Sequence, residues 1–132
     1  MATQAAGTFT VRSWDEDTYQ ELAGDAKLTR ARMGFRLSGG LEGDLISDTL
    51  MCYRADGTAE YTGLQQFTGE IAGRQGSVVM AADGVFDGSE ARSRWRVIPG
   101  SGTAALAGLT GTGSSAAASG PGGTFSLDYE LG

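Results

Sequence analysis

Apolar and polar residues alternate with a period of two over most of the chain, and glycine-containing turns interrupt this alternation at short intervals. Such a pattern is typical of antiparallel β-strands, and apolar positions at helical spacing are almost absent. The clearest strands are 29–37, 91–98 and 124–131, each with one apolar face. Less regular strands are expected at 7–13, 41–54, 58–71, 77–86 and 106–117. The sequence therefore predicts eight strands.

Short turns predict how these strands pair. Two-residue hairpin turns fit three dipeptides: Gly39-Gly40, Asp56-Gly57 and Asp87-Gly88. The pairs that follow are Met33 with Ile46, Ile46 with Phe67, Asp48 with Gln65, Met80 with Trp95, Val78 with Val97 and, on the outer face, Asp83 with Arg92. Apolar positions of neighbouring strands meet in all three hairpins. A slip of one residue would turn a strand's side chains to the opposite face, so the agreement is informative.

Eight antiparallel strands with one apolar face each can close into a barrel, which removes the exposed sheet edges. A flat sandwich is the competing architecture, but 22 glycines in 132 residues favour the tight bends of a barrel. We predict an all-β fold, a single closed or nearly closed eight-stranded antiparallel β-barrel over 7–132 that follows a tail over 1–6. The acidic segment 14–27 is interpreted as a connector, or as a lid over one barrel mouth with Trp14 as its anchor. A flexible hairpin loop is expected at 114–123.

The composition excludes several kinds of chemistry. The chain has no histidine, and Cys52 is its only cysteine, so it has no Ser-His-Asp or Cys-His nucleophile system, no internal disulfide and no cysteine zinc site. The 10 basic and 16 acidic residues give a net charge of -6, which disfavours nucleic acid and anionic membranes as partners. No segment approaches the ~20 apolar residues of a membrane helix. With no signal-peptide pattern at the start, we expect a cytoplasmic protein without metal or cofactor.

The predicted register turns Asp48 and Gln65 inward among apolar side chains. Burial raises a carboxyl pKa by up to ~3–5 units, which would suit Asp48 to general acid or base catalysis. The alternative is a bulge near Ser47 that turns Asp48 to water, because Leu41 and Leu45 have the opposite parity from Ile46 and Leu50. Tyr61 and Tyr129 are the other candidate catalytic groups, with an ordinary core role as the alternative. The residues predicted to bind a ligand are Met33, Phe35, Leu50, Cys52, Gln65, Phe67 and Trp95.

Other features favour structural interpretations. Glu42 and Asp44 fit a solvated barrel rim, with an acid–base pair or a calcium site as alternatives. The arginines at 30, 32, 36, 92, 94 and 96 fit a wet outer face, or alternatively an interface between subunits of a homo-oligomer. Gly100-Ser101-Gly102-Thr103 lacks the Lys-Ser/Thr ending of a phosphate loop and is interpreted as a tight turn.

Several segments together resemble a bacterial family, the domain of unknown function 3224. The segments that carry the resemblance are Ser13-Trp14-Asp15-Glu16, residues 53–59, Gly63-Leu64, Gly69, residues 73–77, Pro99-Gly100-Ser101-Gly102-Thr103, Leu106-Ala107-Gly108-Leu109, Gly111 and Ser126-Leu127-Asp128-Tyr129. Through this family the chain resembles the eight-stranded barrels of allene oxide cyclase and plant dirigent proteins. The resemblance implies that cyclisation or coupling of reactive apolar molecules is guided without a cofactor. No catalytic residue of the plant proteins maps onto this sequence.

Two classes of function follow. The first is a cofactor-free isomerase or cyclase that acts on a small apolar substrate in the lumen, with Asp48, Tyr61 or Tyr129 handling protons. The second is a carrier or sensor that binds a small molecule without converting it. A structural barrel with a packed interior and an oligomeric role is a third option. An enzyme requires a desolvated titratable group in an open cavity, a carrier requires the cavity alone, and a structural barrel has neither.

Overall fold

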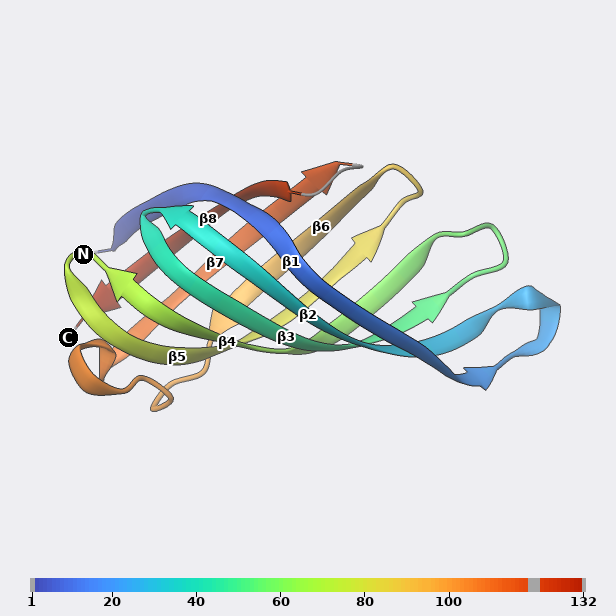
Figure 1. Cartoon of the computed structure of the whole chain (residues 1–132), viewed down its shortest axis with the longest axis horizontal. Helices are drawn as coiled ribbons and strands as arrows, with labels where there is room; N and C mark the ends of the chain where they lie inside the picture. The colour runs from blue at the N-terminus through green and yellow to red at the C-terminus, as the bar shows by residue number, and fades with distance from the viewer. Residues whose placement is uncertain (1, 119–121, 132) are drawn as a thin grey trace.

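Eight antiparallel strands form a closed barrel in the computed structural model, which describes residues 2–118 and 122–131 (Figure 1). The strands are β1 (Thr3–Glu21), β2 (Lys27–Gly39), β3 (Leu41–Tyr53), β4 (Ala59–Ile71), β5 (Arg74–Phe86), β6 (Glu90–Val97), β7 (Leu109–Ala118) and β8 (Gly122–Leu131). Each strand pairs with its neighbours in the chain, and β1 closes the sheet by pairing with β8 from Thr3 to Thr10. The predicted all-β barrel is confirmed.

Both chain termini lie at the same end of the barrel (Figure 1). The half of the barrel near this end is filled by a packed core. Inward side chains from opposite walls meet there, and Leu37, Phe67, Met80 and Leu127 are fully buried. A short 3₁₀ segment, η1 (Ala23–Asp25), joins β1 to β2, and a second, η2 (Ala104–Leu106), packs against β5 at the core end. The η2 side chain Leu106 is fully buried in the core.

The Gly-Ser-Gly-Thr segment is a structured connection between β6 and β7. The Ser101 hydroxyl donates to the carbonyl of Ile98 at 2.7 Å, and the Thr103 N–H donates to the carbonyl of Ser77 at 2.9 Å. A Cβ on Gly102 would lie 2.1 Å from the carbonyl oxygen of Leu106, so only glycine fits there. These contacts hold η2 in place, so the segment has a structural role, as interpreted from the sequence.

The pairing of β3 corrects the predicted register. Tyr53 pairs with Ala59 around the loop 54–58, where the Asp56 carboxylate accepts hydrogen bonds from the N–H and hydroxyl of Thr58 at 3.0 and 2.6 Å. This loop has an odd number of residues, and the hairpin at Gly39 is also displaced by one position. Both ends of β3 are therefore one residue out of the predicted register, which turns the whole strand over.

New partners follow for every residue of β3. Asp48 lies opposite Leu64, and Met33 lies opposite Ser47, so the predicted pairs of Asp48 with Gln65 and of Met33 with Ile46 are wrong. Ile46 lies opposite Gln66 and does not meet Phe67. Pairing runs without interruption from Leu41 to Tyr53, so the bulge considered near Ser47 is absent from this strand.

The β5–β6 hairpin keeps the predicted faces although its partners move. Met80 lies opposite Val97 and Ala82 opposite Trp95, a shift of two positions from the predicted pairing. Because a shift of two preserves the side-chain alternation, Met80, Trp95 and Val97 are buried as predicted. On the outer face Asp83 pairs with Arg94 at 3.1 Å, and Arg92 pairs with Glu90 instead.

β1 is longer at both ends than the sequence pattern indicated. It begins at Thr3, so most of the expected tail pairs with β8, and it runs to Glu21 through the acidic segment interpreted as a connector. A bulge between Val11 and Ser13 interrupts its alternation. This bulge places Trp14 and Glu16 opposite the inward residues of β2, which a strict period of two does not predict.

The remaining expectations concern the last hairpin, the surface and location. Of the loop expected at 114–123, residues 114–118 belong to β7 and 122–123 to β8, while 119–121 lie outside the described residues. The arginines at 30, 32, 92, 94 and 96 are exposed on the outer face and Arg36 is partly so, as expected, and their role as a subunit interface stays a prediction. No helix within 2–118 and 122–131 is long and apolar enough to cross a membrane. The cytoplasmic location stays a prediction.

The buried position of Leu106 leads to a stability prediction. Leu106→Ala should lower the free energy of unfolding by about 2–5 kcal/mol, because it leaves a cavity in the core. Leu64→Ala removes the same atoms from a side chain that is 55% exposed on the outer face and should change stability by less than about 0.5 kcal/mol. Urea unfolding of both variants measures the difference. Equal effects would show that η2 is not part of the core.

Candidate functional site

The other half of the barrel holds a cavity of about 330 Å³. Its lining includes Tyr53, Phe86 and Ala118, the last residues of β3, β5 and β7. These strands end on the side of the barrel opposite the chain termini (Figure 1), so the cavity reaches that end. Among the described residues, β1 pairs only with β2 beyond Thr10, so strand pairing does not close the wall there. The core closes the end of the barrel near the chain termini, and the cavity is accessible from the opposite end.

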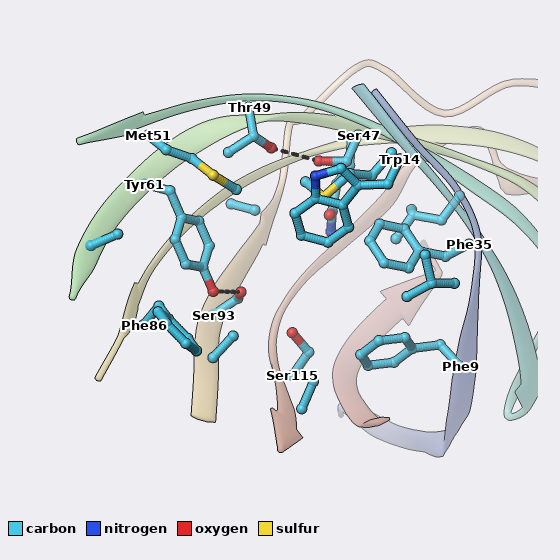
Figure 2. Close-up of a pocket in the computed structure, with 18 of the residues that line it drawn as sticks. Phe9, Trp14, Phe35, Ser47, Thr49, Met51, Tyr61, Phe86, Ser93 and Ser115 are labelled. Carbon is cyan, nitrogen blue, oxygen red and sulfur yellow. Dashed lines mark hydrogen bonds between the residues drawn. The ribbon is translucent and has the colours of Figure 1, made fainter. Parts of the chain in front are cut away.

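Most of the cavity wall is aromatic or aliphatic. Phe9 and Phe35 form an edge-to-face pair with ring centroids 5.5 Å apart, and they lie across the cavity from Tyr61 and Phe86 (Figure 2). Trp95 also lines the cavity and stacks on Phe125 of the core at 5.8 Å. Such aromatic walls suit the faces and edges of a flat apolar molecule.

Tyr61 of β4 reaches across β5 to make a polar contact with β6 in the cavity. Gly84 of β5 lies between Tyr61 of β4 and Ser93 of β6 in the strand register. A Cβ on Gly84 would lie 2.7 Å from the Tyr61 ring, so the glycine leaves space for the ring to cross β5. The Tyr61 and Ser93 hydroxyls are hydrogen-bonded at 2.6 Å (Figure 2). Burial raises the pKa of the Tyr61 phenol, the hydrogen bond with Ser93 opposes this, and the charge of Asp83 raises it further, so the pKa stays above its ordinary value and the phenol is neutral at pH 7.

A second polar group lies on the wall formed by β3 and β4. Ser47 and Thr49 are buried, and their hydroxyls are hydrogen-bonded at 2.8 Å (Figure 2). Gln65 lies directly opposite Ser47 and is only 5% exposed. Its Nε2 is buried without a hydrogen-bond partner among the described residues. An unpaired buried polar group of this kind costs about 1–3 kcal/mol.

The mouth cluster, consisting of Trp14, Glu16, Thr29 and Tyr53, stands at the end of the barrel that the cavity reaches. The Trp14 Nε1–H donates to one oxygen of Glu16 at 2.9 Å, and the Thr29 hydroxyl donates to the other at 2.7 Å. The Tyr53 hydroxyl is within reach of both Glu16 and the sulfur of Met51, and the charged carboxylate is the stronger acceptor. Glu16 thereby fixes the position of Trp14, whose ring lines the cavity.

The charge of Glu16 sets the protonation states of this cluster. Burial acts to raise the pKa of the Glu16 carboxyl, but the hydrogen bonds from Thr29, Trp14 and Tyr53, together with the charge of Lys27, bring its pKa below the ordinary value of 4.5. Burial and the neighbouring carboxylate raise the pKa of Tyr53 to about 12. At pH 7 the carboxylate is therefore ionised, and its hydrogen bonds are already committed to the protein.

Three of the predicted site residues lie outside the barrel. Asp48 is exposed and pairs with Arg32 at 3.3 Å, Leu50 is 46% exposed, and Cys52 is exposed. All three belong to β3, and the reversal of that strand turns their side chains to the outer face. Asp48 therefore cannot act on a molecule in the lumen, and Leu50 and Cys52 do not line the cavity.

Two more predicted site residues point inward but lie in the packed core. Phe67 is fully buried, and Tyr129 is 7% exposed near the end that carries the chain termini. Neither lines the cavity.

Glu42 and Asp44 lie on the outer face, where each is 3.7 Å from Arg36, so they form ion pairs at the surface.

Five of the predicted residues do meet at the cavity: Met33, Phe35, Tyr61, Gln65 and Trp95. The sequence analysis missed Ser47, Thr49 and Met51 because it turned β3 the wrong way. A signal was present, since Leu41, Leu45 and Met51 share the odd parity of the inward face. Trp14 was considered as the anchor of a lid over one barrel mouth, but its place in β1 depends on a bulge that has no signal in the period-two pattern.

The mouth cluster leads to a pH-dependent prediction. Because the folded pKa of Glu16 lies below 4.5, its carboxylate stabilises the fold above that pH, and the contribution is lost as the pH falls through the folded value. Glu16→Gln should lower the free energy of unfolding by about 1 kcal/mol at pH 7, with a smaller difference at pH 3. Asp17→Asn, at the exposed next position, should have little effect at either pH. A deficit of Glu16→Gln that stays constant from pH 7 to pH 3 would contradict this role of the charge.

Comparison with known proteins supports one family assignment. The family model described as "Protein of unknown function (DUF3224)" matches residues 5–129. A solved structure of a protein with unknown function from the same family, from Shewanella oneidensis MR-1, is similar with a TM-score of 0.84 and 27% sequence identity, over 100% of this chain and 99% of that one. No protein of curated function matches the sequence. The barrel, its cavity and the match over nearly the whole chain lead to one assignment: the protein belongs to the DUF3224 family.

Proposed function

We propose that the barrel binds a small apolar molecule in its lumen and serves as a carrier or sensor of that molecule. The observation that carries this proposal is the cavity of about 330 Å³ with a mainly apolar wall, which lies at the low end of the range for small-molecule sites. A purely structural barrel has no need of such a space, because a filled core is more stable than one that contains a cavity.

The titratable groups favour binding over catalysis. Among the described residues that line the cavity none is charged at pH 7, since Tyr53 and Tyr61 both have raised pKa values. The Glu16 carboxylate is held by three donors, and its lowered pKa makes it a poor proton acceptor. A carrier needs none of these groups to titrate, whereas an acid–base catalyst does.

Blocking the cavity tests the proposal. Ala82 lines the cavity between Gly63 and Trp95, and the next residue, Ala81, lies on the outer register between Leu64 and Arg96. Ala82→Phe should reduce the affinity for ethylbenzene by more than about tenfold, because the added ring occupies the binding space. Ala81→Phe adds the same ring outside and should leave the affinity unchanged. Isothermal titration calorimetry makes the comparison, and equal affinities of the two variants would refute binding in the lumen.

A second proposal, a cofactor-free isomerase or cyclase, is supported by the Tyr61–Ser93 hydrogen bond and by the resemblance to allene oxide cyclase-like barrels. Two hydroxyls bonded to each other retain one free O–H, which can polarise an oxygen of a bound substrate. Of the three residues first predicted to be catalytic, Tyr61 is the one that lines the cavity. In this proposal the shape of the cavity would orient the substrate, and the one free O–H would polarise it, without a group that accepts or releases a proton.

Incubation of the natural ligand distinguishes the two proposals. The molecule that copurifies with the protein from its source is extracted and incubated with fresh protein, and the products are separated by chromatography and mass spectrometry. A carrier returns the molecule unchanged. An isomerase converts it to a species of equal mass, and Tyr61→Phe should slow this conversion while ligand retention persists.

A further inference from the structure

We infer that the molecule held in the lumen is neutral and carries an acceptor oxygen, such as that of a ketone, aldehyde, ester or amide, which binds the Gln65 amide. This inference rests on the proposed binding in the lumen and specifies the class of ligand. Two observations carry it: the unpartnered Nε2 of Gln65, and the lack of charge among the cavity-lining residues that the structure describes.

None of the described residues around Gln65 is a hydrogen-bond partner for its Nε2. On β3 it faces Ser47, whose hydroxyl is engaged with Thr49, and on β5 it faces Met80, an apolar side chain. The Gln65 side chain also lines the cavity. The last torsion of a glutamine side chain is soft, so the amide can turn its N–H groups toward a bound molecule. Since Nε2 is purely a donor, the matching group is an acceptor.

A neighbouring hydroxyl can strengthen the same contact. Ser47 and Thr49 are hydrogen-bonded to each other, so one of the two retains a free O–H. This hydroxyl pair lies on the same wall as Gln65, because Ser47 and Gln65 are directly opposite each other on β3 and β4. A carbonyl oxygen has two lone pairs and can accept from both donors. The wall formed by β3 and β4 therefore fits one carbonyl better than it fits an apolar group.

Charge complementarity restricts the ligand to neutral molecules. An ionised group that leaves water for this cavity would find no charged side chain among its described lining residues. The Glu16 carboxylate in the mouth cluster adds a negative charge near the entrance, which disfavours anions further. A free carboxylic acid at pH 7 is thus a poorer ligand than its ester, amide or ketone analogue.

The volume of the cavity limits the size of the apolar part of the ligand. At the ~30 Å³ that one water occupies in the liquid, about 330 Å³ corresponds to roughly ten non-hydrogen atoms. Phe9, Phe35 and Trp95 provide apolar surfaces for them. A single aromatic ring with one carbonyl substituent has the required size, polarity and shape.

Three probes test the inference by isothermal titration calorimetry: acetophenone, ethylbenzene and benzoate. Acetophenone and ethylbenzene have similar shapes and differ in the acceptor, while benzoate carries a charge. The wild-type protein should bind acetophenone about 2- to 12-fold more tightly than ethylbenzene, the range expected for one net hydrogen bond. Benzoate should bind at least about tenfold more weakly than acetophenone.

Variants at neighbouring positions assign the effect to Gln65. Gln65→Leu should abolish the preference for acetophenone while ethylbenzene still binds, and Gln65→Met, which is closer in shape, should do the same if the leucine variant does not fold. Gln66→Leu is the matched control, because Gln66 is exposed on the outer face, and it should keep the wild-type preference. Thermal unfolding confirms that each variant is folded.

The outcomes separate this inference from the proposed function. Equal affinity of the wild type for acetophenone and ethylbenzene, or a preference that survives in both Gln65 variants, would overturn the role of Gln65 and leave binding in the lumen intact. Tighter binding of benzoate than of acetophenone would overturn the neutral class. No binding of either neutral probe would overturn the inference together with the lumen proposal.

Discussion

Closure of the sheet through the pairing of β1 with β8 is the constraint on which the rest of the structure depends. In a closed barrel every strand has one face in the lumen and one in water, so each residue's parity decides which environment it meets. The energetic preference for burying apolar faces fixes this parity for most strands. For β3, which carries Ile46 and Leu50 on one face and Leu45 and Met51 on the other, the neighbouring turns and closure decide it.

The lumen is divided between a packed core and a cavity. Toward the chain termini, large side chains and Leu106 of η2 fill it as a core. Toward the other end, small residues such as Ala82 and Ser93 leave the space between the aromatic walls open. Gly84 shapes this half, because it lets the Tyr61 ring cross β5 and reach Ser93. The same barrel thus has a filled half and a hollow half.

The polar groups of the open half are arranged in two different ways. In the mouth cluster Glu16 has its hydrogen bonds satisfied by the protein, which fixes Trp14 at the entrance. Deeper in the cavity, the Gln65 Nε2 has no hydrogen-bond partner among the described residues, and the proposed ligand would supply one. An unpaired buried polar group lowers the stability of the fold. Such groups are expected at functional sites, whereas a purely structural core gains nothing from them.

The sequence by itself determined the all-β class, the number of strands and the inward faces of β2, β4, β6 and β8, because period-two alternation is a local property of each strand. It thereby placed Met33, Phe35, Tyr61, Gln65 and Trp95 in the lumen correctly. The tertiary structure alone decided the orientation of β3, the inward turn of Trp14 and the boundary between core and cavity, which excluded Asp48, Phe67 and Tyr129 from the site. Loop length, a bulge and the filling of the lumen depend on contacts between distant segments, and the alternation within one strand carries no information about them.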